Sequence, residues 1–262
     1  MPTSRPSAAL LVAAALTLAA LPASLQAQGT ARGLDGEYTA RRDTTLDARG
    51  ARRVDVEGRA GELRVTGVAG LREVRVRGTA RASRERWLDE IRVEARRDGD
   101  VVRVRADIPD RMGGDWGGDM QVRALDLVIE VPQGIDADVR DGSGSLEIRG
   151  VGALSLVDGS GEVRITDVAS ADVEDGSGEV RIDGVRGDVR LADGSGSLIV
   201  SRVGGAVHVE RDGSGEVDVR DVAGDLVVRR SRAAGVQYAN VRGRVDVPEP
   251  RESRAARRTR WY

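Results

Sequence analysis

Five aspartates recur along the chain at nearly constant spacing, and each begins the tetrapeptide Asp-Gly-Ser-Gly. Successive copies are 17, 17, 18 and 19 residues apart and start at Asp141, Asp158, Asp175, Asp193 and Asp212. If each copy lies at the same corner of a stacked β structure, the carboxylates form a row with a spacing of about 4.8 Å. Carboxylate oxygens are the ligands that Ca²⁺ prefers, and Ca²⁺ takes six to eight of them. The row is therefore a candidate calcium site.

Turn chemistry explains the same tetrapeptide without a metal. Aspartate accepts hydrogen bonds from the amides of its own turn, and glycine adopts a positive φ. We expect the row to lie in water, where repulsion between neighbouring carboxylates costs less than about 1 kcal/mol each and is screened by salt. We therefore predict a turn motif that needs no metal or other cofactor, with calcium on the aspartate row as the alternative.

Two glutamates follow the corner in adjacent units, at Glu162 and Glu179, and each has an arginine two residues later. Paired carboxyl groups at a set separation could hydrolyse a glycosidic bond. However, two sister units carry Ser145 and Ser197 at the same position, which is typical of a solvated face. On that face we expect the acidic and basic side chains to pair as diagonal neighbours, and we predict no catalytic residue.

Two further residues could contact a ligand. His208 is the single histidine and the chain has no cysteine, so it lacks partners for a metal site or a catalytic triad. Its place between Val207 and Val209 predicts an outward side chain. Trp116 lies in the glycine-rich segment PDRMGGDWGGDM, which interrupts the strand pattern. An aromatic residue on such a loop could contact sugars or peptides, and the alternative is that Trp116 caps the open end of the fold.

Apolar residues stand at fixed offsets from each tetrapeptide and alternate with polar ones, which indicates strands with one buried face. In the first and third units they are Leu146, Ile148, Val151, Leu154 and Leu156, and Val180, Ile182, Val185, Val189 and Leu191. Each unit therefore reads as two short strands and two turns. Because one pair of short strands cannot bury its apolar face alone, stacking is required. The sequence predicts an all-β, elongated β-solenoid with coils of 17–19 residues.

The strand pattern continues upstream in degenerate form. The segment IRVEARRDGDVVRVRADI predicts a hairpin with an Asp-Gly turn, and SRERWLDEI predicts a short helical turn with Trp87, Leu88 and Ile91 on one side. We divide the chain into a signal peptide (1–27), a degenerate β-rich part (28–140), the regular repeats (141–230), a last degenerate coil (231–248) and a basic mobile tail (249–262).

The first 27 residues have the layout of a secretory signal peptide. Arg5 gives a weakly basic start, residues 8–23 form an uncharged apolar run, and cleavage after Ala27 is plausible. The run is shorter than the 20 or so apolar residues of a comfortable membrane span, although an uncleaved amino-terminal anchor is the alternative. We expect export to the periplasm or cell surface, with no membrane span in the mature chain.

Composition limits the partners. The chain contains no lysine, and residues 98–230 hold 28 acidic residues against 15 arginines, a net charge of −13. A nucleic-acid-binding protein would need a basic stripe with aromatic residues beside it. We therefore expect no nucleic-acid partner. The absence of cysteine means that no disulfide stabilises the fold.

The repeated unit GSGEVRI–GV–GDVRL resembles the putative adhesin family, a group of bacterial exported β-strand-repeat proteins with a domain of unknown function. The lead-in VIEVPQGIDADVRDGSGSLEI also resembles this family, in which a strand ending in Val-Pro precedes the first GSG coil. The resemblance covers residues 63–228. It implies an elongated β-solenoid of the cell envelope, and it brings no catalytic residues.

Three functions fit these observations. The first is an adhesin-like binding module that contacts an envelope or surface polymer or protein. The second is a structural scaffold that assembles end to end, which would require both end coils to be open. The third is a polysaccharide-active enzyme. The degenerate first half and the proline-containing tail are typical of caps, so we favour the binding module; its oligomeric state is left open.

Overall fold

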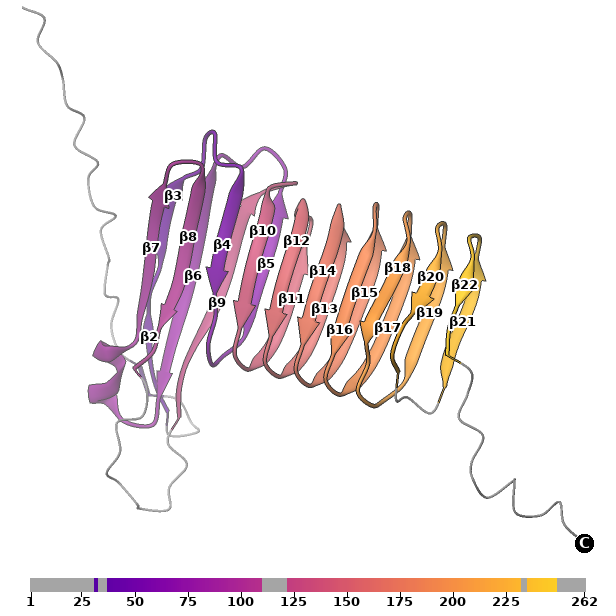
Figure 1. The fold of residues 1–262 in the computed structure, drawn as a ribbon. Helices are drawn as coiled ribbons and strands as arrows, with labels where there is room; N and C mark the ends of the chain where they lie inside the picture. Colours follow the sequence, from indigo (N-terminus) through magenta and orange to yellow (C-terminus); the bar gives the residue numbers. More distant parts are fainter. Residues whose placement is uncertain (1–30, 33–36, 110–121, 232–234, 249–262) are drawn as a thin grey trace, which may run out of the picture.

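The computed structural model describes residues 31–32, 37–109, 122–231 and 235–248, and it shows an elongated stack of β-strands (Figure 1). The predicted all-β solenoid is confirmed. Two sheets, A and B, run the length of the stack and face each other across one core. Within the described residues the only helical segment is a short 3₁₀ helix, η1 (Glu85–Glu90).

Sheet A holds twelve of the described strands. In spatial order they are β1 (Ala31–Arg32), β2 (Tyr38–Arg41), β6 (Glu73–Ala82), β9 (Arg123–Pro132), β5 (Leu63–Val68), β11 (Gly144–Arg149), β13 (Gly161–Val168), β15 (Gly178–Val185), β17 (Gly196–Val203), β19 (Val217–Val222) and β21 (Val236–Val241), with β3 (Thr44–Asp47) also paired to β6.

Sheet B holds ten of the described strands. From the C-terminal end of the stack they are β22 (Val245–Asp246), β20 (Leu226–Val228), β18 (Val207–Arg211), β16 (Val189–Asp193), β14 (Ser170–Asp175), β12 (Ala153–Asp158), β10 (Asp136–Asp141), β4 (Arg53–Glu57), β8 (Val101–Asp107) and β7 (Arg92–Asp98).

Each regular coil consists of one strand from each sheet, as the repeat predicts. The strand β12 ends at Asp158, the tetrapeptide turns the corner, and β13 continues in sheet A. The next coil stacks on it in parallel with identical positions opposite each other, so Asp158 faces Asp175 and Val163 faces Val180. Equivalent side chains therefore form rows along the solenoid.

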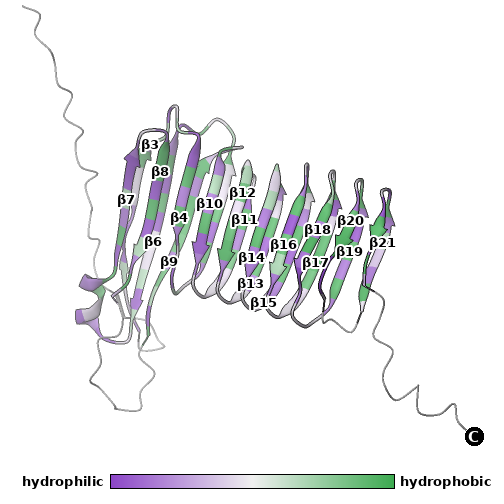
Figure 2. Ribbon diagram, in the orientation of Figure 1, coloured by the Kyte–Doolittle hydropathy of each residue, from purple (hydrophilic) through white to green (hydrophobic). Residues whose placement is uncertain are grey.

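The core is a set of aliphatic rows between the two sheets. All ten predicted core residues of the first and third units are buried. The hydropathy colouring in Figure 2 shows the alternation of apolar and polar positions along the strands. Because Val, Ile and Leu fill nearly every inward position of the regular coils, successive layers match in width.

In the N-terminal half, the spatial order of the coils differs from their order in the sequence. The strands β4 and β5 pair in parallel with β10 and β11 on one side and with β8 and β9 on the other. The predicted Asp-Gly hairpin is confirmed: β7 and β8 are antiparallel, with Asp98 opposite Val101 and Gly99 at a φ of +60°. The chain therefore inserts β6 and β7 before it forms the coil next to β4 and β5.

The N-terminal end of the core is covered by η1, where the sequence predicts a helical turn. Trp87, Leu88 and Ile91 are all buried there. Arg42 is also buried, and its guanidinium donates to the carbonyl oxygens of Ile91 (2.9 Å), Arg41 (2.8 Å) and Leu88 (2.7 Å). These hydrogen bonds hold η1 over the core.

No helix in the described part of the chain is long and apolar enough to cross a bilayer. The predicted signal peptide and the predicted basic tail both lie outside the described residues.

Candidate functional site

The corner formed by each tetrapeptide requires glycine at two positions. The second glycine of every copy has a positive φ, as predicted, from +134° at Gly144 to +145° at Gly178 and Gly196. The first glycine is needed for space, because a Cβ atom on Gly159 would lie 2.4 Å from the carbonyl oxygen of Gly142 in the preceding coil. Backbone hydrogen bonds join the corners, as from the Gly159 amide to the Asp141 carbonyl (3.1 Å). The tetrapeptide is therefore a corner in which backbones stack directly.

The aspartate of the tetrapeptide points inward, so the expectation of a row in water is wrong. All five aspartates are buried, with between 1% and 8% of their surface exposed. Four of them are the last residue of their sheet B strand, and Asp212 directly follows β18. Along β12, for example, Leu154, Leu156 and Asp158 alternate into the core. We call these five side chains the aspartate row.

Most carboxyl oxygens of the aspartate row have no hydrogen-bond partner among the described residues. Both oxygens of Asp158, Asp175 and Asp193 are buried without one. At one end of the row, Gly58 stands opposite Asp141 and leaves it space. At the other end, the Ser231 hydroxyl donates to Asp212 at 2.6 Å. A buried carboxylate without a donor is costly, so these groups are expected to bind protons instead.

Burial raises the pKa of these carboxyl groups. It raises the pKa of Asp141 to about 6. Burial, and then the neighbouring Asp158, raise the pKa of Asp175 to about 6. Burial, and then Asp175 and Asp212, raise the pKa of Asp193 to about 7. The pKa of Asp158 is also raised, chiefly by burial, and the adjacent Gly159 amide opposes the rise without completing a hydrogen bond.

The aspartate row is therefore suited to sharing protons between coils. Asp158 and Asp175 face each other in register and both have a raised pKa, chiefly because they are buried, so a proton bound to one carboxyl can be shared with the other. Calcium stays a hypothesis for this row. Within the described residues, no three or more His, Cys, Asp or Glu side chains converge as a metal site would require.

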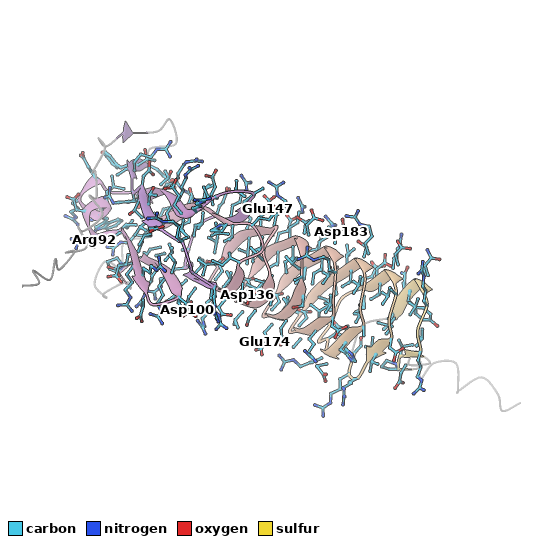
Figure 3. All side chains as sticks on the ribbon, turned by 90° about the horizontal axis from the view of Figure 1, so that it is seen from above. Arg92, Asp100, Asp136, Glu147, Glu174 and Asp183 are labelled. Carbon is cyan, nitrogen blue, oxygen red and sulfur yellow. The ribbon has the colours of Figure 1, made fainter. Side chains whose placement is uncertain are left out.

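The outer face of sheet A carries a second row, which we call the acidic row. It consists of outward residues at equivalent positions in seven adjacent strands or, for Glu62 and Glu216, directly before the strand: Asp126, Glu62, Ser145, Glu162, Glu179, Ser197 and Glu216. As Figure 3 shows, charged side chains project from both sides of the stack, with Glu147 and Asp183 on the side of sheet A and Glu174 on the side of sheet B.

Acid and base pair on this face, but Glu162 and Glu179 pair within their own strands and not with diagonal neighbours as predicted. Glu162 pairs with Arg164 at 2.6 Å, and Glu179 pairs with Arg181 at 2.6 Å. A cross-strand pair joins Arg64 to Glu147 at 2.8 Å. These side chains are about half exposed, so each pair contributes little to stability.

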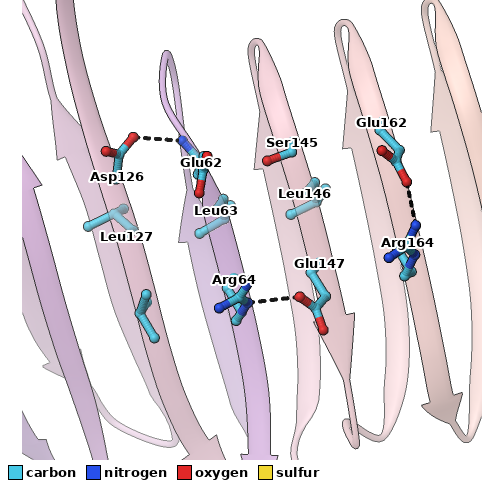
Figure 4. A pocket seen from close by; sticks show the side chains of 11 residues that line it. Glu62, Leu63, Arg64, Asp126, Leu127, Ser145, Leu146, Glu147, Glu162 and Arg164 are labelled. Carbon is cyan, nitrogen blue, oxygen red and sulfur yellow. Dashed lines mark hydrogen bonds and ion pairs between the residues drawn. The ribbon is translucent and has the colours of Figure 1, made fainter. Parts of the chain in front are cut away.

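Serine at one position of the acidic row leaves a hollow in the surface. The hollow has a volume of about 200 Å³ and lies over β9, β5, β11 and β13. Figure 4 shows Ser145 between Glu62 and Glu162, with the pair formed by Arg64 and Glu147 beside it. Carboxylates and a hydroxyl that accept hydrogen bonds therefore stand close to guanidinium donors. The repeat shows serine in place of glutamate at Ser145, but the flanking Glu62 and Asp126 belong to segments whose place beside β11 leaves no local signal in the sequence.

The remaining predicted site residues lie elsewhere. His208 is on β18 beside the buried Val207 and Val209, and its side chain is on the outward register, as predicted. Trp116 lies outside the described residues, so its predicted ligand contact stays a prediction.

No protein-family model and no curated protein matches the chain. Two solved structures are similar to it. One is a putative cell adhesion protein from Clostridium sporogenes ATCC 15579, with 11% identity, a TM-score of 0.33, and coverage of 79% of this chain and 98% of the other. The second is a putative adhesin from Bacteroides fragilis NCTC 9343, with 15% identity, a TM-score of 0.49, and coverage of 79% and 96%.

Both neighbours are described as the kind of protein that the sequence resembles. At these identities, no residue's role is transferred from either protein to this chain.

Proposed function

We propose that the protein is an exported, non-enzymatic binding module of the cell envelope. In this proposal the outer face of sheet A contacts a repeating envelope or surface polymer, or a protein that displays one. The observation that carries the proposal is the acidic row with its hollow at Ser145, because five carboxylates and two serine hydroxyls stand at equivalent positions, one strand spacing of about 4.8 Å apart. A linear array of this kind suits a ligand that also repeats along a line.

The chemistry of the face supports a polar ligand. Carboxylates of the acidic row accept hydrogen bonds from hydroxyl or amide groups, and the guanidinium groups of Arg64 and Arg164 donate to carboxylates or phosphates. Both arginines line the hollow. Because each contact is exposed and weak, affinity would come from several coils engaging one polymer at once.

Sedimentation with insoluble envelope polymer tests this proposal. The chain from Gln28 is mixed with the isolated polymer, and the pelleted fraction is measured against salt concentration. We expect binding by the parent chain and its loss when Arg64 and Arg164 are both changed to Glu. The matched control is Arg190→Glu, an exposed site on β16 of the opposite sheet, and it should bind like the parent.

Failure of the parent to bind, or equal loss with the control, would contradict a site on sheet A. Release of soluble fragments from the polymer would instead favour the polysaccharide-active enzyme. Export is tested separately by fractionating cells that produce the full chain and sequencing the amino terminus of the product. Recovery in the periplasm or at the surface, beginning at Gln28, is the expected result, and retention in the cytoplasm with Met1 intact would contradict it.

A further inference from the structure

The two ends of the solenoid finish in strands of opposite character. At the N-terminal end, the outermost strand of sheet B is β7, with the sequence RVEARRD, in which five of seven residues are charged. At the C-terminal end, the outermost strand of sheet A is β21, with the sequence VQYANV, in which no residue is charged. Charged side chains on an edge strand discourage pairing with another chain. Of these two edge strands, only β7 has this protection.

The C-terminal strands each have one free edge within the described part of the chain. β21 pairs with β19, so that Val217 is opposite Val236 and Val219 is opposite Tyr238. β22 pairs with β20 in the same way in sheet B. No described strand pairs with the other edge of either, and Figure 1 shows both at the far end of the stack. Two rows of backbone donors and acceptors therefore lie side by side.

The last layer of the core is also incompletely covered. Tyr238 occupies the inward position that Val219 holds in the preceding coil, yet 49% of its surface is exposed. Val236, Val241 and Val245 are only partly buried against the core. By contrast, at the other end Trp87 and Leu88 are buried over the core. An exposed apolar layer bordered by two free edges is typical of an association surface.

We propose that this C-terminal end binds the same end of a second copy of the chain, so that two solenoids join tail to tail. A twofold axis perpendicular to the planes of the two sheets would reverse the direction of the strands. β21 would then pair antiparallel with β21 of the second copy. Like charges that face each other across two paired strands are destabilising. Because β21 contains no charged residue, two copies of β21 can pair without such repulsion. β22 carries a single acidic residue, Asp246, and the turn between β21 and β22 carries the exposed Arg242 and Arg244.

The N-terminal end limits this assembly to two copies. A head-to-tail stack would place β21 and β22 of one copy against the cap of the next, where β7 presents its charges and η1 covers the core. A twofold contact uses the same surface on both copies and leaves no further free end. The assembly is therefore a closed dimer with two acidic rows in line, and a single polymer could engage both.

Sedimentation velocity and small-angle X-ray scattering on the chain from Gln28 test the proposal. We expect a dimer whose maximum dimension is close to twice that of the monomer. Ala239→Lys places a charge on the exposed side of β21 and should abolish the dimer at concentrations where the parent is dimeric. The matched control is Thr166→Lys, because Thr166 holds the same register position in an interior coil. Circular dichroism of both variants establishes that they fold.

Four results would overturn the proposal. They are a parent chain that stays monomeric at all concentrations, a compact side-by-side dimer, open-ended polymers, and equal loss of the dimer with Thr166→Lys. The same measurements are repeated on a chain that lacks residues 249–262. If only the shortened chain forms the dimer, that segment is the natural occupant of the edge and the second copy is not.

Discussion

The N-terminal cap and the repeated stack both bury ionisable side chains, but they stabilise them differently. In the cap, the Arg42 guanidinium is buried and donates to three backbone carbonyl oxygens. In the stack, the carboxyl oxygens of Asp158, Asp175 and Asp193 are buried without a donor. A guanidinium keeps its charge in proteins, whereas a carboxyl group can lose its charge by binding a proton. The stability of the cap therefore depends on its hydrogen bonds at any pH, whereas the stability of the stack changes with pH.

The largest effect is expected from removing the buried cation of the cap. Arg42→Met leaves the carbonyls of Leu88 and Ile91 without their donor, so the free energy of unfolding should fall by about 4 kcal/mol. Urea denaturation at pH 5 and pH 8 measures it, and the loss should be equal at both. Arg41→Met, at an exposed neighbour, is the control and should change stability by less than about 0.5 kcal/mol. A loss below about 1 kcal/mol for Arg42→Met would mean that η1 does not depend on this side chain.

The pH dependence of the parent chain is the next largest effect. Because the folded pKa of Asp141 is raised from 3.8 to about 6, the folded state binds more protons than the unfolded state between these values. The stabilisation is complete below about pH 4 and is lost as pH rises through about 6 to 7, the values of Asp175 and Asp193.

The share of that loss due to Asp141 follows from its own pKa. A rise in pKa from 3.8 to about 6 corresponds to about 3 kcal/mol. At acid pH the stability falls as the pH decreases. The pKa of Asp183 is lowered by the adjacent Arg202, so this ion pair is lost when Asp183 is protonated. Unfolding by urea should therefore show maximum stability near pH 5. Stability that stays constant or increases between pH 5 and pH 8 would contradict protonation of the row.

Replacing one carboxyl group by an amide separates burial from charge. Asp193→Asn retains the shape, cannot ionise, and can donate to its neighbours as in stacked asparagine ladders. We expect a gain of about 2 kcal/mol at pH 8 and almost none at pH 4.5. Asp183→Asn, on the outer face and paired with Arg202, is the control and should give no gain. Destabilisation by Asp193→Asn at pH 8 would show that the row needs its negative charge, as a bound cation would require.

The smallest effect is expected on the outer face. Glu162 and Arg164 pair at 2.6 Å with about half of each side chain exposed. Arg164→Gln should therefore lower the free energy of unfolding by about 0.5 kcal/mol or less. Thermal unfolding in low and high salt measures this difference. A loss comparable to that of Arg42→Met would mean that the outer rows hold the coils together.

Much of the fold could be predicted from the sequence because the repeat aligns equivalent residues. The offsets of Leu146 and Ile148 gave the buried positions, and Asp98-Gly99 gave the hairpin turn. The position of β8 and β9 beyond β4 and β5 could not be predicted, because pairing between strands far apart in the sequence leaves no local signal.

The direction of the aspartate row was predicted wrongly, although the signal was present. Counting by twos from Leu154 through Leu156 reaches Asp158, so the alternation continues through the aspartate into the core. Turn chemistry competed with this reading, because Asp followed by Gly is also typical of exposed turns. The alternation decides the outcome, since Asp158 is still part of β12 and takes the inward position two residues after Leu156.

The coils have nearly constant length, and each contacts only its neighbours. Duplication of a segment within the gene can therefore change the length of the molecule. An in-frame copy of the codons for residues 158–174 would add one complete coil and extend the rod by about 4.8 Å. Neither the cap nor the last coil would need a compensating substitution. Related chains could therefore differ in length by whole coils and keep the same two ends. Counting the repeats in each sequence would reveal such differences.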